Sequence, residues 1–444
     1  MRESPISCFI MLDEICNLLD LFSPSKQRRN WSKLKYLIIT NEVGISENAN
    51  SNIVWAICSE MIKENEVHIF SVASFVKHKK IVYKGYPVFM FGPNIGIHSY
   101  SSKYNQFKDI IKLIPFLLKP HLWVAALRLF IRKLNAEKSD SIESFFAAYR
   151  IKLLNKQHKY DRIIAVCAPS MCIHITARLR HLHVSIYQLD PFHSNTTMQS
   201  GLKHWRLNIE MRAYKNAECV YLTKLIESEY RNTVLAKYET KWVVVNFPLI
   251  YQHVTGESKP SIHFSNKSIN CLYSGTLDMK YRNPQFALEM AKRLGDDYCF
   301  YFIGSNCVEV IENTLGCRDG RIICLNPLPS DVIYQLMASA DFLVNIGNTM
   351  KNQMPSKIID YISTGKPIIN IVKSSECPTL QYTNRYSLCL DVLETEKIDD
   401  NVLADINTFC TSNKSRTIPY QYVEETFFDC TPAHVANIIM GTTA

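Results

Sequence analysis

A chain of 444 residues exceeds the size of one ordinary hydrophobic core, so we expect two domains of about 200 residues each. Hydrophobic residues make up 47% of the chain, and the fifteen cysteines lack paired C-x-x-C spacings, which favours reduced thiols over a disulfide scaffold. The net charge of +9 is uneven: residues 1–246 hold 34 Lys and Arg against 20 Asp and Glu, and the remainder holds 16 against 21. No zinc-finger spacing or RNA-binding motif accompanies the basic half, so we expect no nucleic-acid partner.

The first predicted element is an amphipathic helix over residues 8–22, without the pattern of a signal peptide. The longest apolar region, residues 110–131, is broken by charges and prolines and falls short of the uninterrupted run of about 20 residues that spans a bilayer. Between Lys103 and Lys159, basic residues alternate with apolar ones. This segment either packs on its own sheet or lies on an anionic membrane surface. We expect a cytoplasmic protein, with attachment to the inner face of the plasma membrane left open.

Short β-branched and aromatic runs then alternate with helical patterns, which predicts parallel strands joined by crossover helices. The predicted strands of a first sheet are 36–40, 67–72, 163–168, 184–189 and 219–223, and those of a second sheet are 269–274, 298–303, 321–325, 342–346 and 367–371. A strand ending at Asn246 precedes the polar linker, and Thr431 followed by Pro432 predicts a last helix from about Pro432 to Met440.

The predicted chain therefore has five parts. These are a lead-in over 1–31, a Rossmann-like domain over 32–250, a linker over 251–268, a second Rossmann-like domain over 269–425 and a C-terminal helix within 426–444. Two doubly wound α/β domains facing each other imply a ligand cleft at the carboxyl ends of their strands.

The segment from Asp341 to Ile371 carries the strongest signal for a binding site. Its strand is followed by a loop, and Pro355 opens a predicted helix that stops at Gly365. Lys357 in the first helical turn opposes the helix dipole, which favours a phosphate contact over a merely solvated lysine. Asp360 lies on an adjacent part of the same face, where it either accepts hydrogen bonds from a ribose diol or pairs with Lys357 on the surface.

A second candidate segment follows the strand 269–274. Gly275 lies in a strand-to-helix loop whose backbone N–H groups can approach a phosphate, and Lys280 and Arg282 are the cations that would neutralise it. Gly275 alone is equally typical of a plain turn.

The first domain offers three candidates for the acceptor side. Asp190 and His193 follow the strand 184–189, and either could orient or deprotonate an acceptor hydroxyl. The alternatives are a turn aspartate and a surface histidine. Glu42 follows the first strand and is a further candidate.

The runs N-I-G-N (345–348) and P-S-K-I-I-D-Y-I-S-T-G-K-P-I-I (355–369), together with the Gly275 loop, resemble the donor site of GT-B glycosyltransferases. The resemblance covers roughly residues 269–371 and is to the large retaining, family-four-type group that builds bacterial capsule, exopolysaccharide and lipopolysaccharide. In many members two glutamates stand eight positions apart. Asp360 matches the second, which binds the ribose, whereas Asn352 departs from the first, which binds the donor sugar. The donor contacts that the resemblance implies are Gly275, Lys280, Arg282, Asn348, Asn352, Ser356, Lys357 and Asp360.

The resemblance implies a metal-independent hexosyltransferase without a cofactor. Its donor would be a UDP-sugar or GDP-sugar, and its acceptor a glycan or a polyprenyl-diphosphate-linked glycan. The chain contains no D-x-D metal motif and no P-loop motif, in line with this expectation. Two alternatives stay open: a nucleotide-sugar 2-epimerase of the same fold, and a non-catalytic partner subunit, which the asparagine at 352 makes plausible.

Overall fold

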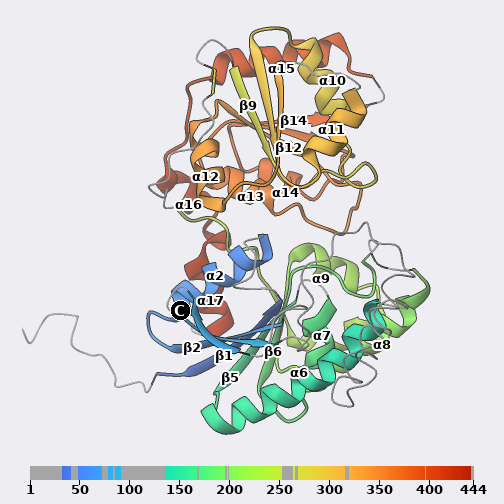
Figure 1. Ribbon diagram of the computed structural model, residues 1–444, viewed down its shortest axis with the longest axis vertical. Helices are drawn as coiled ribbons and strands as arrows, with labels where there is room; N and C mark the ends of the chain where they lie inside the picture. Colours follow the sequence, from blue (N-terminus) through green and yellow to red (C-terminus); the bar gives the residue numbers. More distant parts are fainter. Residues whose placement is uncertain are drawn as a thin grey trace, which may run out of the picture. The chain divides into compact units, whose positions relative to one another are not determined.

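The computed structural model describes most of the chain between residues 33 and 441. The described ranges are 33–41, 49–72, 79–83, 86–91, 136–167, 170–195, 198, 200–252, 264–265, 269–315, 320–395 and 397–441. Lys35–Ala444 forms one compact unit. Within this unit the described residues build two sheets, which we call the first lobe and the second lobe together with the helices that cover them (Figure 1).

The first lobe contains an eight-stranded sheet in the part of the chain that is described, in the order β3-β4-β2-β1-β5-β6-β7-β8. All neighbouring strands are parallel except β3 and β4, which form an antiparallel pair at one edge. The strands are β1 (Lys35–Asn41), β2 (Glu66–Val72), β3 (Lys79–Tyr83), β4 (Tyr86–Phe91), β5 (Arg162–Cys167), β6 (Val184–Gln188), β7 (Val220–Leu222) and β8 (Trp242–Val244).

Both faces of this sheet are covered by helices. Successive side chains of a strand point to opposite faces, so neighbouring residues of one strand pack against different helices. In β1, Tyr36 and Ile38 pack into the same core as α2 and α17, whereas Leu37 and Ile39 pack with α6, α7 and α8. Figure 1 shows α2 in blue beside α17 in red. The helices are α2 (Ala49–Met61), α6 (Ala136–His158), α7 (Ser170–Thr176), α8 (Lys203–Asn216), α9 (Lys224–Tyr230), α17 (Pro432–Met440) and the short 3-10 helices η2 (Ser200–Leu202) and η3 (Val234–Lys241).

The chain returns to the first lobe at its C-terminal helix. The Tyr221 hydroxyl donates to the Ile439 carbonyl at 3.0 Å, and the Arg162 guanidinium donates to the Met440 carbonyl at 2.8 Å. The Thr431 side chain caps the helix and Pro432 occupies its first turn, so the predicted start and end of this helix are confirmed.

The second lobe contains a parallel sheet, six-stranded among the described residues, in the order β11-β10-β9-β12-β13-β14. Its strands are β9 (Ile269–Ser274), β10 (Tyr298–Ile303), β11 (Ile322–Leu325), β12 (Phe342–Ile346), β13 (Ile368–Val372) and β14 (Cys389–Leu393). Its helices are α10 (Gln285–Arg293), α11 (Cys307–Leu315), α12 (Ser330–Ser339), α13 (Lys357–Ser363), α14 (Leu380–Thr383), α15 (Asp400–Asn413), α16 (Tyr420–Thr426) and the 3-10 helix η4 (Phe428–Cys430). The strand order reverses between β9 and β12, and open α/β sheets bind ligands at such a switch point.

Every strand predicted from the sequence is present in the structure, with ends that differ by at most one residue apart from the short β8. The edge strands β3 and β14, and β4 beside β3, were not predicted. β3 and β4 form a hairpin rather than a strand-helix unit, so the alternating pattern does not reveal them. The predicted helix over 8–22 and the apolar region 110–131 lie outside the described residues, and in the described part no helix is long and apolar enough to cross a membrane.

Candidate functional site

A pocket of about 420 Å³ lies at the carboxyl ends of the second-lobe strands. The loops that follow β9, β10 and β12 line one side, through Gly275 with Thr276, Gly304 with Ser305, and Asn348. The first lobe contributes Asp190, just after β6, and two asparagines of α2. The pocket therefore occupies the switch point that the fold predicts for a ligand.

The two strand-end loops of the pocket touch through glycine. Gly304 has a φ of +150°, and a Cβ atom added to it would lie 1.9 Å from the carbonyl oxygen of Gly275. Only a residue without a side chain allows this approach. The backbone at Gly275 is thereby held at the pocket wall, but its N–H donates to the Ile303 carbonyl at 3.0 Å and is not directed at a ligand.

The structure distinguishes between Arg282 and Lys280, the two candidate phosphate-binding cations between which the sequence could not choose. Arg282 lines the pocket, and its guanidinium is fixed because Nε donates to Asn348 Oδ1 at 3.2 Å and Nη1 donates to the Thr276 carbonyl at 3.3 Å. Lys280 is exposed, is not among the pocket-lining residues, and carries its ammonium 4.8 Å from the centre of the Tyr281 ring. Arg282 is the better placed of the two for a diphosphate.

Lys357 and Asp360 meet at the pocket on α13. The helix starts at Lys357, two residues later than predicted, with Ser356 as its cap residue, and Gly365 follows its end with a left-handed φ of +71°. Lys357 Nζ lies 3.2 Å from Asp360 Oδ2 and 5.6 Å from the centre of the Tyr334 ring. Ser356, Lys357 and Asp360 all line the pocket.

Asp360 is not part of a surface ion pair. Its side chain is only 3% exposed, and its second oxygen, Oδ1, has no hydrogen-bond partner among the residues that the structure describes. Burial raises the pKa of this carboxyl and Lys357 lowers it, with the net result above its ordinary value of 3.8. A buried carboxylate oxygen without a donor is costly, so a donor supplied by a ligand would be strongly favoured there.

Asp190 enters the pocket from the first lobe. Burial raises the pKa of its carboxyl to about 6, and a hydrogen bond from the Gln353 side chain opposes that shift. A carboxyl with this pKa is mostly ionised at pH 7 and can accept a hydrogen bond from a ligand hydroxyl. Gln353 belongs to the second lobe, so this contact joins the two lobes at the pocket.

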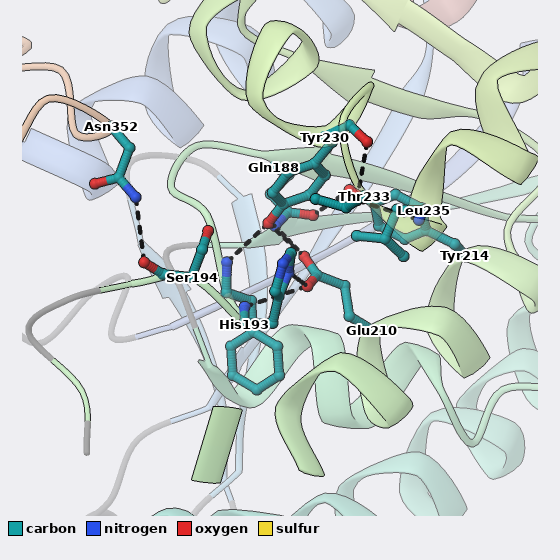
Figure 2. Close-up of polar contacts among 10 residues, drawn as sticks. Gln188, His193, Ser194, Glu210, Tyr214, Tyr230, Thr233, Leu235 and Asn352 are labelled. Carbon is teal, nitrogen blue, oxygen red and sulfur yellow. Dashed lines mark hydrogen bonds and ion pairs between the residues drawn. The ribbon is translucent and has the colours of Figure 1, made fainter. Parts of the chain in front are cut away.

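His193 does not lie on the surface, and it does not line the pocket. It is 3% exposed, and its Nδ1 donates to Glu210 Oε2 at 2.7 Å (Figure 2). The Asn352 amide donates to the Ser194 carbonyl at 3.2 Å and is not among the pocket-lining residues either. Glu42 lies outside the described residues.

Several residues at this site were not predicted from the sequence. Asn52 donates to the Tyr334 hydroxyl at 3.2 Å between the lobes, and Gln353 contacts Asp190. Glu210 lies in a helix whose sequence suggests a surface position, yet it is fully buried. These contacts join segments far apart in the chain, which no local pattern reports.

Comparisons with known proteins agree with this architecture. No protein-family model and no curated protein sequence matches the chain. Among solved structures, the apo structure of OtsA superposes with a TM-score of 0.60 at 10% identity, covering 92% of this chain and 99% of that one. HepE from Anabaena, solved in complex with UDP and glucose, gives 0.56 at 12% identity, covering 91% and 98%. The lipopolysaccharide outer core galactosyltransferase WaaB gives 0.52 at 12% identity, covering 92% and 100%.

At these identities the likeness concerns the fold. The chain has two parallel-sheet α/β domains of the GT-B type, as expected from its sequence.

Proposed function

We propose that this chain is a glycosyltransferase that moves a sugar from a nucleotide-sugar donor to a hydroxyl of a glycan or lipid-linked glycan. The observation that carries the proposal is the pairing, in one pocket at the switch point, of a fixed cation with a buried carboxylate oxygen that lacks a donor. The GT-B fold and a structural neighbour solved with UDP and glucose support it.

The donor would lie along the second-lobe side of the pocket. Arg282 and Lys357 would contact the diphosphate, the loop at Gly275 and Thr276 would lie against it, and Asp360 would accept hydrogen bonds from the ribose. In the reaction the bond between the sugar carbon and the diphosphate oxygen breaks, and a new bond forms to the acceptor oxygen. Negative charge then grows on the diphosphate, and fixed cations stabilise it without reorganising.

The acceptor would approach from the first lobe. Asp190 faces the pocket there and would orient the acceptor hydroxyl, whose proton goes either to this carboxylate or to the departing phosphate. If the likeness to the retaining group extends to stereochemistry, the phosphate takes the proton and the configuration at the sugar carbon is kept. We propose that the reaction needs neither a cofactor nor a metal ion.

A role in bacterial surface polysaccharide synthesis, with a lipid-linked acceptor, is supported by one face of α6. Phe145, Tyr149 and Leu153 are exposed at a spacing of four residues, which places them on one helix face, and Lys152 and Lys156 beside them are exposed too. Apolar side chains flanked by lysines suit an anionic membrane surface. We propose that the protein acts at the inner face of the plasma membrane.

The proposal is tested by titration calorimetry with UDP, GDP and their common sugar conjugates, in the presence of a chelator. Tight binding of one nucleotide without metal supports the donor site, and no binding of any refutes it. Lys357→Ala is expected to weaken binding at least tenfold, since it removes a phosphate contact. Lys351→Ala is the matched control, because Lys351 belongs to the neighbouring loop, is exposed, pairs with Glu376 and does not line the pocket.

Turnover assays decide between the proposal and its two alternatives. Release of nucleotide that depends on an acceptor indicates a transferase. Conversion of the nucleotide-sugar without any acceptor indicates an epimerase, and nucleotide binding without turnover indicates a non-catalytic subunit.

A further inference from the structure

The loop after β6, residues 189–195, is held in place by a buried cluster of hydrogen-bonded side chains that takes no direct part in the proposed reaction. Glu210 of α8 is its centre, and its carboxylate is fully buried. It accepts hydrogen bonds from Gln188 Nε2 at 2.7 Å, from the Tyr230 hydroxyl at 2.7 Å, and from both the backbone N–H and Nδ1 of His193 at 3.2 and 2.7 Å (Figure 2).

The other members of the cluster hold the same loop. The Tyr230 hydroxyl accepts from the Phe192 backbone N–H at 3.0 Å, and Tyr214 donates to Gln188 Oε1 at 2.8 Å. Gln188 is the last residue of β6. The cluster therefore forms hydrogen bonds with the chain at the end of β6 and again at positions 192 and 193. Asp190 lies between these fixed points.

The hydrogen-bond chemistry identifies Glu210 as the organising group. A carboxylate offers only acceptors, so every group that faces it must donate, and this fixes the His193 ring with a proton on Nδ1. A buried carboxylate is costly in an apolar core unless its oxygens are saturated with donors, and here four donors do so. Fully satisfied buried networks of this kind hold a segment in one geometry.

We propose that Glu210 is a positioning residue that holds the 189–195 loop so that Asp190 faces the acceptor side of the pocket. The proposal rests on the proposed function for the role of Asp190. It assigns His193 to the support of the loop and not to the reacting groups. The loop is also joined to the second lobe, because Asn352 donates to the Ser194 carbonyl and Gln353 contacts Asp190.

Three variants test the assignment. Glu210→Gln keeps the shape but introduces an amide whose two N–H donors face groups that donate themselves. The matched control is Glu227→Gln, because Glu227 is also a buried glutamate, but its side chain pairs with Lys224 and Arg231 and not with the described residues of the loop. His193→Asn retains a donor near the position of Nδ1, whereas His193→Leu removes it.

A misplacement of a reacting group by about 1 Å can lower a rate on the order of 100-fold. We therefore expect Glu210→Gln to lower kcat by about 10- to 100-fold while the Kd for the nucleotide changes less than about twofold, because the donor contacts lie in the second lobe. His193→Asn is expected to keep most of the activity and His193→Leu to lose it. Equal losses for the two His193 variants would instead make the imidazole itself essential and overturn the assignment.

The sharpest test is a double-mutant cycle. If Glu210 acts through Asp190, then Glu210→Gln causes no further loss of kcat in an Asp190→Asn background, whereas additive losses overturn the proposal. The proposal also requires Asp190→Asn alone to lower kcat, because Asp190 is the group that Glu210 is proposed to position.

Hydrogen exchange gives a readout that does not depend on activity. The amides of Phe192 and His193 are expected to exchange faster in Glu210→Gln than in the wild type and in Glu227→Gln, with the protection of β5 and β7 unchanged. Unchanged exchange at these two amides refutes the positioning role. If the wild-type protein shows no turnover with any nucleotide-sugar, the proposed function fails, and hydrogen exchange still decides whether Glu210 fixes the loop.

Discussion

The substitution Asp360→Asn is expected to change ligand affinity and protein stability in opposite directions. The carboxylate is 3% exposed, one oxygen meets Lys357 at 3.2 Å, and the other has no donor among the described residues. Because burial holds its pKa above the ordinary value, ionised Asp360 destabilises the folded protein without ligand at neutral pH. Asparagine removes that charge at almost unchanged volume.

The magnitudes follow from the same geometry. A hydrogen bond from a ribose hydroxyl to a charged acceptor contributes about 1.5–3 kcal/mol, so its loss raises the Kd for the nucleotide roughly 10- to 150-fold. The free energy of unfolding without ligand is expected not to fall, since the substitution removes a buried charge and the partner Lys357 is 28% exposed and stays solvated. Titration calorimetry measures the first quantity and urea denaturation the second.

Asp391→Asn is the matched control for this experiment. Asp391 belongs to β14, accepts from Asn370 Nδ2 at 2.6 Å and from the Thr383 hydroxyl at 3.0 Å, and does not line the pocket. Its substitution is expected to lower stability and leave the Kd unchanged. If Asp360→Asn also lowered stability and left the Kd unchanged, Asp360 would be an ordinary structural partner of Lys357 and the donor site would be misassigned.

Two further predictions concern the pocket walls. With a pKa of about 6, folded Asp190 keeps its proton between about pH 4 and 6 whereas the unfolded chain loses it, so the contribution of Asp190 to the free energy of unfolding falls by up to about 3 kcal/mol as the pH rises through that window. Urea denaturation of the wild type and of Asp190→Asn at a series of pH values is expected to show a difference in stability that changes with pH in this way, and a constant difference would contradict the raised pKa. Gly304→Ala would place a Cβ atom 1.9 Å from the Gly275 carbonyl oxygen and must displace that loop. We expect it to weaken nucleotide binding at least tenfold by calorimetry while Gly320→Ala, whose added Cβ meets no atom within 4 Å, does not; equal affinities would show that the Gly275 backbone takes no part in binding.

The sequence was most informative where the site residues lie close together in the chain. Ser356, Lys357 and Asp360 fall within five positions at the start of one helix, and a buried strand before them fixes which end of the sheet they occupy. The helical period then places the lysine and the aspartate side by side. The structure confirms this local arrangement, although the helix starts two residues later than expected.

The sequence was least informative where the site depends on packing between distant segments. Asn52 and Tyr334 are 282 positions apart and Ser194 and Asn352 are 158 apart, and no periodicity relates them. Glu210 looks like a solvated charge in a polar helix, and only the folded lobe reveals that it is buried.

At Asn352, a residue singled out by the local sequence pattern makes a contact with a distant segment of the chain. The resemblance places an acidic residue that binds the donor sugar at this position, yet in this chain the side chain donates to the Ser194 carbonyl, which a carboxylate cannot do. The asparagine is therefore suited to joining the second lobe to the loop that Glu210 holds on the other side. Under the proposed function, the contacts to the donor sugar would then come from other pocket groups. The neighbouring Gln353 lines the pocket and contacts Asp190, so under the proposed function its side chain is a candidate for that contact.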